Sequence, residues 1–499
     1  MIPRRTFLKA AGAVAGLAVT EPWRAVHSLA APRLAQGTTA FDHVVVLMME
    51  NRSWDHFMGW LPGANGVQAG LQYTDTAGTT YPTYPLAPDF QGCGYADPDH
   101  SWEGGVKQLN GGRVDGFLKT AVPGDTFPIG YYTEQDVPVL AALAKNYTIS
   151  DNYFCSILAE TYPNRFYQHA AQTDRDHNNF NVATIPTVWD LLATAGLSGR
   201  YYHSDLPFLA LWGTKYASIM RDYNAFFAAD CAAGNLPNVA FVDPSFNGES
   251  QGVSQDSHPH GDIRAGETFI ADVYHAVRSS PNWAKTVMIL NFDEWGGFYD
   301  HVVPPRVIDD HVGAGPGPHP DYHQLGFRVP NVVISPFAHR GRVVSSGAPF
   351  DHTSVLRMIE WRWGLPPLNA RDANARNLAD MLNFSLNRTD NPVVPSGTMP
   401  ISVACLPGAA AHPPAPVSGT GGAGQSGGGP GAGSGNGGGL PNTTAALIAS
   451  PAVAVGTTAV AAAGLGARAL ARRRRGPAAA APGDPASVSC PANPGSGRR

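Results

Sequence analysis

Residues 44–56 read VVVLMMENRSWDH, an unbroken apolar run that ends abruptly in Glu50, Asn51 and Arg52. A continuous apolar run without polar alternation is typical of a strand buried on both faces of a sheet. In open α/β sheets, ligands bind beyond the carboxyl ends of the strands, where this run delivers its polar residues. The stretch therefore predicts an α/β fold with a candidate site directly after the strand.

Similar apolar runs alternate with helical patterns from about Phe41 to about Pro407. The expected strands span residues 43–49, 198–203, 238–242, 286–292 and 329–335. The helical patterns between and after them cover residues 137–147, 187–196, 266–280 and 352–364. This alternation predicts an α/β sandwich whose sheet is covered by helices on both faces.

The composition and the charge narrow the class of protein. The chain has 499 residues, of which 43% are hydrophobic and 15% charged, enough apolar material for a large core of one or two domains. Its net charge of -5 offers no basic surface for nucleic acid, so no nucleic-acid partner is expected. The cysteines are too scattered for a CxxC metal motif, and the sequence does not reveal which of them form disulfides. They are Cys93, Cys155, Cys231, Cys405 and Cys490.

The N-terminus, residues 1–35, has the pattern of a twin-arginine signal peptide. Arg4 and Arg5 precede a weakly hydrophobic Ala/Gly/Val run, and small residues at Ala30 and Ala31 offer a cleavage position. The alternative is a short membrane anchor or a chance pair of arginines. Since twin-arginine export moves folded proteins that often carry a metal already, the pattern favours an exported metalloenzyme, extracellular or bound at a bacterial cell surface.

The composition changes after residue 407. Residues 408–439 consist largely of Ala, Pro, Gly and Ser, which predicts a disordered, flexible linker. Residues 440–475 begin with LPNT, continue as an apolar stretch and end in four arginines, a pattern that indicates a C-terminal sorting or membrane segment. The alternative is a disordered Ala-rich tail, which is also expected for residues 476–499.

Acidic residues directly follow two of the expected strands. Glu50 and Asn51 follow the first strand, and Asp293 and Glu294 follow the strand at 286–292. Carboxylates gathered at neighbouring strand ends repel one another unless a cation holds them, so the two ends predict a bound divalent metal. The alternative is that these acids only cap the helices and turns that follow.

A third segment, AETYPNRFYQHAAQ at residues 159–172, places Thr161 two residues before Pro163, where a helix begins. Its hydroxyl would lie at the positive end of the helix dipole, which favours an anion and lowers the cost of an alkoxide. The alternative is that Thr161 is an ordinary helix N-cap.

Several histidines lie in loops rich in Asp, His, Pro and Gly. There they could bind phosphate oxygens, protonate a leaving group or ligate a metal. Any one of them could instead be a hydrogen-bonded loop residue, so the shared loop context supports the set more than each member. The set is His100, His258, His260, His301 and His352.

Together these segments resemble the successive motifs of the phosphoesterase family of bacterial phospholipases C and secreted acid phosphatases, in the alkaline phosphatase superfamily. The motifs lie at residues 43–59, 161–173, 258–267, 292–305 and 351–364, and the similarity covers about residues 40–385. The resemblance implies a catalytic domain over residues 40–407. It also implies an alkaline-phosphatase-like α/β/α sandwich with a central, mostly parallel sheet.

The resemblance further implies the roles of individual residues. Thr161 would be the nucleophile and His258 or His352 the proton donor to the leaving group, while His100, His258 and His301 would bind the substrate. The extra His260 leaves open which histidine faces the phosphate. The implied ligands all offer oxygen, which favours one hard divalent cation, Ca²⁺ or Mg²⁺. These ligands are Glu50, Asn51, Thr161, Asp293 and Glu294.

The resemblance implies an exported, metal-dependent hydrolase of phosphoester bonds, with phospholipase C activity on phospholipids as the leading expectation. Broad acid phosphatase activity on phosphomonoesters is an alternative, because this chain has a linker where larger phospholipases C continue into β-rich domains. A non-catalytic cell-surface binding protein is an alternative of another class. Such a protein would not need the complete set of metal ligands and nucleophile.

Overall fold

The computed structural model describes residues 37–311, 313 and 318–417. The predicted signal peptide, the sorting segment at 440–475 and the tail at 476–499 lie outside these residues, as does the linker beyond residue 417. Within the described ranges, no helix has both the length and the apolar character needed to cross a membrane.

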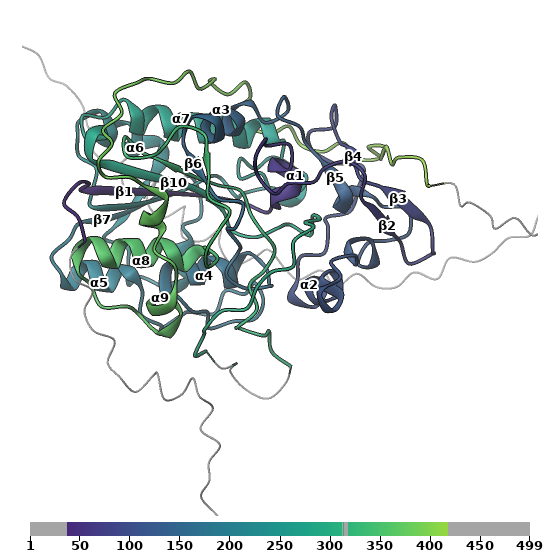
Figure 1. Cartoon of the computed structure of the whole chain (residues 1–499), viewed down its shortest axis with the longest axis horizontal. Helices are drawn as coiled ribbons and strands as arrows, with labels where there is room; N and C mark the ends of the chain where they lie inside the picture. The colour runs from purple at the N-terminus through teal and green to yellow at the C-terminus, as the bar shows by residue number, and fades with distance from the viewer. Residues whose placement is uncertain (1–36, 312, 314–317, 418–499) are drawn as a thin grey trace, which may run out of the picture. The chain divides into compact units, whose positions relative to one another are not determined.

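A central sheet of eight strands organises the fold (Figure 1). Only β11 runs antiparallel to its neighbours in this sheet of the described residues, and the other pairs are parallel. The expectation of a mostly parallel sheet is therefore confirmed. In spatial order the strands are β12 (Arg342–Val343), β6 (Thr148–Ile149), β11 (Asn331–Ile334), β10 (Thr286–Phe292), β1 (His43–Met49), β9 (Val239–Asp243), β7 (Gly199–His203) and β8 (Met220–Asp222).

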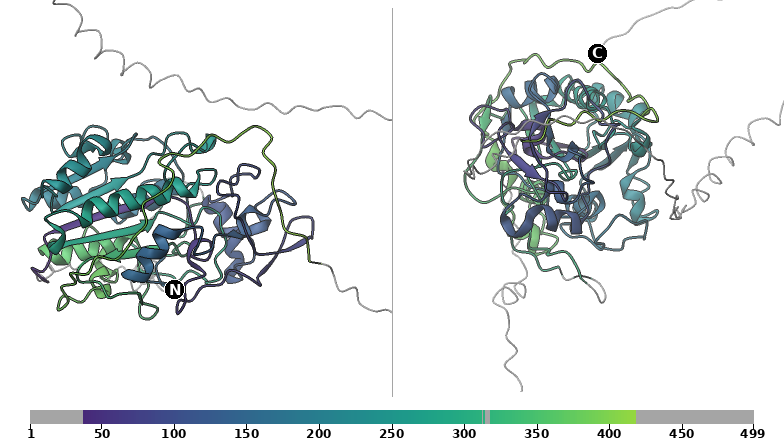
Figure 2. Two further views of the ribbon diagram at one scale, coloured as in Figure 1. Left: turned by 90° about the horizontal axis from the view of Figure 1, so that it is seen from above. Right: turned by 90° about the vertical axis from the view of Figure 1, so that its right-hand side faces the viewer.

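Helices cover both faces of this sheet, as Figures 1 and 2 show. One face carries α3 (Pro138–Asn146), α6 (Tyr223–Ala232) and α7 (Ile263–Arg278). The other carries α4 (Thr161–Ala170), α5 (Val188–Thr194), α8 (His352–Trp363) and α9 (Ala370–Asn374). The predicted α/β/α sandwich is thus confirmed. All five expected strands and all four expected helical patterns correspond to elements of the structure.

Strand β1 lies in the middle of the sheet, between β10 and β9, and is parallel to both. Its residues Val44 to Met49 are all buried, which explains why its sequence shows no polar alternation. The register with β10 pairs Met49 with Phe292, the last residue of each strand. As a result, the next residues, Glu50 and Asp293, leave the sheet side by side.

Smaller elements lie beyond the carboxyl ends of these strands (Figure 1). They are α1 (Trp54–Met58), α2 (Trp102–Leu109), the hairpin of β2 (Gln72–Thr74) and β3 (Thr80–Pro82), and the pair β4 (Tyr84–Pro85) and β5 (Gly130–Tyr131). Each has at most eight residues, and none of them was predicted from the sequence.

Residues 397–417, which we call the C-terminal strap, run along the domain after the last helix. The strap forms hydrogen bonds with residues from three separate segments, Thr268, Gln251 and Thr80. A disulfide between Cys93 and Cys405 fixes it covalently. The first ten residues of the predicted linker, 408–417, belong to this strap and bond to the domain through His412 and Val417.

Candidate functional site

Three neighbouring strands each deliver a carboxylate to the same point. Asp293 follows β10, Glu50 follows β1, and Asp243 is the last residue of β9. Asp293, Glu50 and Asp243 are almost completely buried, with 0%, 2% and 3% of each residue's surface exposed. Burial and the repulsion of Asp293 raise the pKa of Glu50 well above its usual value, although Arg165 acts in the opposite direction. Such a concentration of buried negative charge is stable only with a cationic partner.

Asn51 connects these strand ends to the predicted nucleophile. Its side-chain nitrogen lies 3.1 Å from Glu50 Oε2, 3.3 Å from Thr161 Oγ1 and 3.3 Å from Asp293 Oδ1. We call these three oxygens the oxygen cluster. Asn51 reaches it because its backbone is left-handed, with φ of 61°, a conformation that asparagine adopts more readily than most residues. The other side-chain atom of Asn51, Oδ1, is buried without a hydrogen-bond partner among the described residues.

The glycine after the second acidic pair allows this turn to pack tightly. Gly296 has φ of 64°, and a Cβ atom there would lie 2.1 Å from the backbone oxygen of Asn51. No side chain fits at that distance, so Gly296 permits the close approach of the two strand-end loops.

Thr161 is the first residue of α4, and Glu160 is the N-cap. The alternative reading of Thr161 as an ordinary N-cap is therefore wrong. The helix directs the Thr161 hydroxyl into the oxygen cluster, and only 6% of the residue is exposed. The N-terminus of α4 contributes positive potential at the same place.

Arg165 is a central residue of the site that the sequence analysis missed. It lies one turn after Thr161 on α4, and its Nε is 3.1 Å from Glu50 Oε1 and 3.0 Å from Asp293 Oδ2. Its Nη1 is 3.1 Å from Asp243 Oδ1. Burial opposes its charge, but the three carboxylates outweigh burial and raise the pKa of the guanidinium. The available signal in the sequence was the spacing, because an arginine four residues after Thr161 lies on the same face of the helix as the candidate nucleophile.

Glu294 directly follows Asp293 and faces His100. Its Oε2 accepts a hydrogen bond from the backbone nitrogen of Gly296 at 2.6 Å. Its Oε1 has no hydrogen-bond partner in the described chain and lies 3.9 Å from His100 Nε2. Burial raises the pKa of Glu294 to about 8, with Asp293 adding to the shift and His100 opposing it.

His100 and His258 form a pair with ring centres 5.7 Å apart. Their Nδ1 atoms bond to the backbone oxygens of Pro98 and Pro259, so each directs its Nε2 away from the backbone. Burial lowers the pKa of His100, but Glu294 and Asp97 outweigh it and raise the pKa to about 9. Burial lowers the pKa of His258. The two imidazoles thus have opposite pKa shifts, raised for His100 and lowered for His258.

His258, rather than His260, lies beside the predicted metal ligands. Side-chain donor atoms of Glu50, Glu249 and His258 lie within 4.8 Å of one another. His260 instead bonds through Nε2 to the backbone oxygen of Tyr95 and stacks on Phe127. Glu249 is a second residue of this region that the sequence analysis did not identify.

The structure does not bring His301 to the oxygen cluster. Its Nδ1 lies 2.5 Å from Asp55 Oδ2 and its Nε2 lies 3.0 Å from Asn65 Oδ1. Asp55 also binds Arg328, which neutralises this separate cluster. Because both ring nitrogens of His301 already have partners there, the geometry contradicts its predicted contact with substrate.

The predicted acid role of His352 also needs correction. His352 is fully buried, and its Nε2 bonds to the backbone oxygen of Asp293 at 2.7 Å. Its Nδ1 lies 3.3 Å from the hydroxyl of Tyr153, and burial lowers the pKa of the ring to about 4. A neutral imidazole bonded on both sides has no proton to give to a leaving group. His352 instead supports the backbone that carries Asp293.

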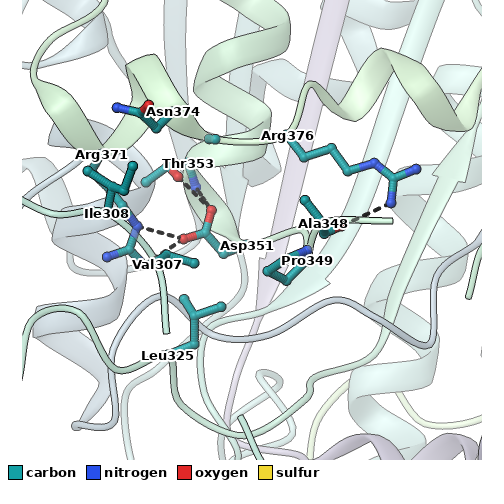
Figure 3. Close-up of a pocket in the computed structure, with 11 residues that line it drawn as sticks. Val307, Ile308, Leu325, Ala348, Pro349, Asp351, Thr353, Arg371, Asn374 and Arg376 are labelled. Carbon is teal, nitrogen blue, oxygen red and sulfur yellow. Dashed lines mark hydrogen bonds and ion pairs between the residues drawn. The ribbon is translucent and has the colours of Figure 1, made fainter. Parts of the chain in front are cut away.

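A small pocket beside the N-terminus of α8 is lined by none of the predicted site residues (Figure 3). Its polar groups serve the fold: Asp351 is the N-cap of α8 and accepts hydrogen bonds from Arg371 and Thr353. Arg371 also bonds to Asp309 and is only 2% exposed. This network holds the start of α8, and therefore His352, under the site.

The site residues fit a hard divalent cation. The oxygen cluster and the two unpartnered buried oxygens, Asn51 Oδ1 and Glu294 Oε1, are carboxylate, amide and hydroxyl oxygens. Such donors are the preferred ligands of Mg²⁺ and Ca²⁺. Among the described residues, no cysteine belongs to a group of side chains that could hold a metal ion, and the free Cys155 and Cys231 are buried.

Comparisons with known proteins show the family to which this chain belongs. A profile of the Phosphoesterase family matches residues 41–366. The chain is 33% identical over 452 residues to Phospholipase C B of Mycobacterium tuberculosis, which covers 74% of this chain and 84% of that protein. It is 31% identical over 389 residues to Non-specific phospholipase C6 of Arabidopsis thaliana, which covers 70% of this chain and 74% of that protein.

Among solved structures, a protein in the alkaline phosphatase superfamily from Vibrio parahaemolyticus is similar with a TM-score of 0.34 and 12% identity. The match covers 69% of this chain and 71% of that chain. A similarity this low supports no argument about the site.

Proposed function

Because this chain belongs to the phosphoesterase family, we propose that it cleaves phospholipids as a phospholipase C, with Thr161 as the nucleophile. The family membership makes it a hydrolase of phosphoester bonds. Relatives named phospholipase C, matched over most of their length, support the narrower substrate class. The observation that carries the proposal is the Thr161 hydroxyl at the start of α4, directed into the oxygen cluster.

One divalent cation of the Mg²⁺ or Ca²⁺ class would bind at this point. When bound, such a cation lowers the pKa of a coordinated hydroxyl and offsets charge on the phosphoryl oxygens. Its ligands would be Glu50, Asn51, Thr161, Asp293 and Glu294.

Hydrolysis proceeds in two displacements. First, the bond between Thr161 Oγ1 and phosphorus forms while the bond from phosphorus to the leaving alcohol breaks, and the hydroxyl proton passes to water. The leaving oxygen takes a proton from Nε2 of His258 in its imidazolium form, and because burial lowers the pKa of His258 this form is favoured at acidic pH. Water then attacks phosphorus and gives a proton to His258, the bond to Thr161 breaks, Thr161 Oγ1 regains a proton from solvent, and the phosphorylated head group leaves.

Fixed charges around Thr161 support this reaction. His100, cationic beside Glu294, binds a phosphoryl oxygen. The N-terminus of α4 adds positive potential where the new bond forms. These groups are held in place before substrate binds, so little reorganisation is needed in the transition state.

Phosphomonoester hydrolysis is the second candidate. The cationic His100 favours it, because a monoester carries more negative charge than a diester and gains more from a fixed cation. Rates on phosphatidylcholine and p-nitrophenyl phosphate, measured with the same metal-loaded protein, separate the two candidates. Higher kcat/KM on phosphatidylcholine, lost in Thr161→Val, is the expected result. A preference for the monoester would assign the acid phosphatase reaction instead.

The disulfide supports export of the protein as part of this proposal. Cys93 and Cys405 are 312 residues apart in sequence and are bonded to each other. Disulfides of this kind persist in oxidising compartments and are rare in the cytosol. Export can be tested by replacing both Arg4 and Arg5 with Lys. We expect the wild-type protein to be secreted and the double variant to be retained in the cell.

A further inference from the structure

Arg165 divides the oxygens of the two central carboxylates. It binds Glu50 through Oε1, at 3.1 Å from Nε and 3.0 Å from Nη2. It binds Asp293 through Oδ2, at 3.0 Å from Nε. The other oxygen of each carboxylate, Glu50 Oε2 and Asp293 Oδ1, belongs to the oxygen cluster. Each carboxylate therefore has one oxygen turned to the arginine and one turned to the cluster.

Glu294 also has one carboxylate oxygen that is hydrogen-bonded and one that is not, but its partner is a backbone nitrogen rather than Arg165. The backbone nitrogen of Gly296 holds its Oε2, and its Oε1 remains without a hydrogen-bond partner among the described residues. Each of the three acidic residues predicted to hold the cation thus has one oxygen held by Arg165 or by the backbone of Gly296. Asp293 Oδ1, the oxygen turned to the cluster, also accepts hydrogen bonds from the backbone nitrogens of Asn51 and Glu294. The remaining predicted ligands, Thr161 and Asn51, also offer one oxygen each.

Arg165 is itself held firmly in this orientation. Asp243 Oδ1 accepts a hydrogen bond from its Nη1, and the other oxygen of Asp243 accepts one from the Tyr201 hydroxyl. The guanidinium also lies over the ring of Phe246, 4.7 Å from its centre. Both carboxylate oxygens of Asp243 thus already accept hydrogen bonds, one from Arg165 and one from Tyr201. Asp243 therefore orients Arg165 and is not one of the predicted metal ligands.

We propose that Arg165 determines the metal selectivity of the site by restricting Glu50 and Asp293 to one ligand oxygen each. This inference rests on the proposed function, which includes a bound divalent cation. Ca²⁺ takes six to eight oxygens and commonly binds a carboxylate through both. Mg²⁺ is smaller and requires six ligands in near-octahedral geometry. Carboxylates that each offer a single oxygen would match the smaller ion. The site is therefore selective for Mg²⁺ over Ca²⁺.

Lysine cannot replace arginine in this role. The guanidinium is a rigid planar fork whose separate nitrogens reach Glu50, Asp293 and Asp243 together. An ammonium group carries the same charge on a single atom, so it cannot hold all three carboxylates in these orientations. Arg165→Lys therefore changes the orientation of the carboxylates while keeping the net charge of the site.

The test measures binding of the metals alone to the metal-free full-length chain by titration calorimetry. Dissociation constants for Mg²⁺ and Ca²⁺ are compared for wild type, Arg165→Lys and Asp243→Asn. Arg328→Lys is the matched control, since Arg328 is also fully buried and binds two aspartates, Asp55 and Asp300, away from the site. Melting temperatures show whether each variant is folded.

We expect the preference for Mg²⁺ to fall by roughly tenfold or more in Arg165→Lys, the scale on which groups behind metal ligands act. Asp243→Asn should move the ratio in the same direction, and it decides the question alone if Arg165→Lys does not fold. Arg328→Lys should leave the ratio unchanged. Metal binding with an unchanged ratio in the folded variants overturns the role of Arg165 but leaves the proposed function intact. Failure of wild type to bind either metal overturns both.

Discussion

Asn51 and Asp293 are hydrogen-bonded twice, although 242 residues separate them in the sequence. The backbone nitrogen of Asn51 lies 3.1 Å from Asp293 Oδ1, and its side-chain nitrogen lies 3.3 Å from the same atom. These bonds join the ends of β1 and β10 directly above the last paired residues of the two strands. The candidate metal site is therefore anchored to the paired ends of two central strands of the sheet.

Removal of the Asn51 side chain should weaken metal binding. Asn51→Ala takes away the amide next to all three oxygens of the cluster, so the affinity for a divalent cation should fall roughly tenfold to hundredfold. Calorimetric titration of the metal-free protein measures this change. Asn110→Ala is the matched control, because Asn110 is also left-handed, with φ of 46°, but caps α2. Equal affinity in Asn51→Ala and wild type would contradict the assigned ligand set.

Only one of two neighbouring histidines should affect catalysis. His258→Gln should lower kcat by roughly 10²- to 10⁴-fold, because the leaving group loses its proton donor. His260→Gln should retain most of the activity, since its ring bonds to the backbone of Tyr95 away from the metal ligands. Steady-state kinetics on phosphatidylcholine compare the two variants. A larger loss of kcat in His260→Gln than in His258→Gln would contradict the assignment of His258 as the proton donor.

Reduction of the disulfide should loosen the strap and the His258 loop together. Cys405 bonds through its backbone nitrogen to Gln251, and Gln91 links Val403 of the strap to the backbone oxygen of His260. Replacement of Cys93 and Cys405 by Ser should therefore lower stability by about 2–5 kcal/mol and also reduce kcat/KM. Denaturant unfolding and kinetics measure the two effects. Wild type treated with reductant should behave like the double variant, and full activity in both would exclude this link.

Glu267 should make the protein less stable as the pH rises. Burial raises the pKa of its carboxyl from 4.5 to about 8, although backbone hydrogen bonds from Val139 and Leu140 oppose the shift. Between these pH values the folded chain binds the proton more tightly than the unfolded chain, so increasing pH favours unfolding. Glu267→Gln should flatten this part of the stability profile, as measured by urea unfolding from pH 4.5 to 8. A profile of unchanged slope would contradict the assignment.

The parts of the fold that were predicted from sequence are those with strong local patterns. The strands β1 and β10 are continuous apolar runs because they lie in the middle of a parallel sheet. The polar residues that follow them marked the site for the same reason. The short strands β6 and β12 contain two residues each and have no recognisable periodicity. Their pairing depends on segments far away in the chain.

The errors within the site also have physical causes. Arg165 resembles a solvent-facing residue of an amphipathic helix, and its partners Glu50 and Asp293 lie 115 and 128 residues away. His352 occurs in an Asp-His motif that suggested chemistry, but sequence does not show that both its ring nitrogens bond to buried groups. His301 was misassigned for the same reason, because Asp55 and Asn65 come from a different segment.

The most direct test of the account is to identify the residue that becomes covalently phosphorylated. The metal-loaded protein is mixed with p-nitrophenyl phosphate, quenched in acid and digested, and the phosphorylated peptide is located by mass spectrometry. We expect a phosphoryl group on Thr161, in a peptide that also contains Arg165 when the protease used does not cleave after arginine. Thr161→Val should show no such group and no turnover. A phosphoryl group on any other residue, or normal turnover by Thr161→Val, would contradict the assignment of the nucleophile.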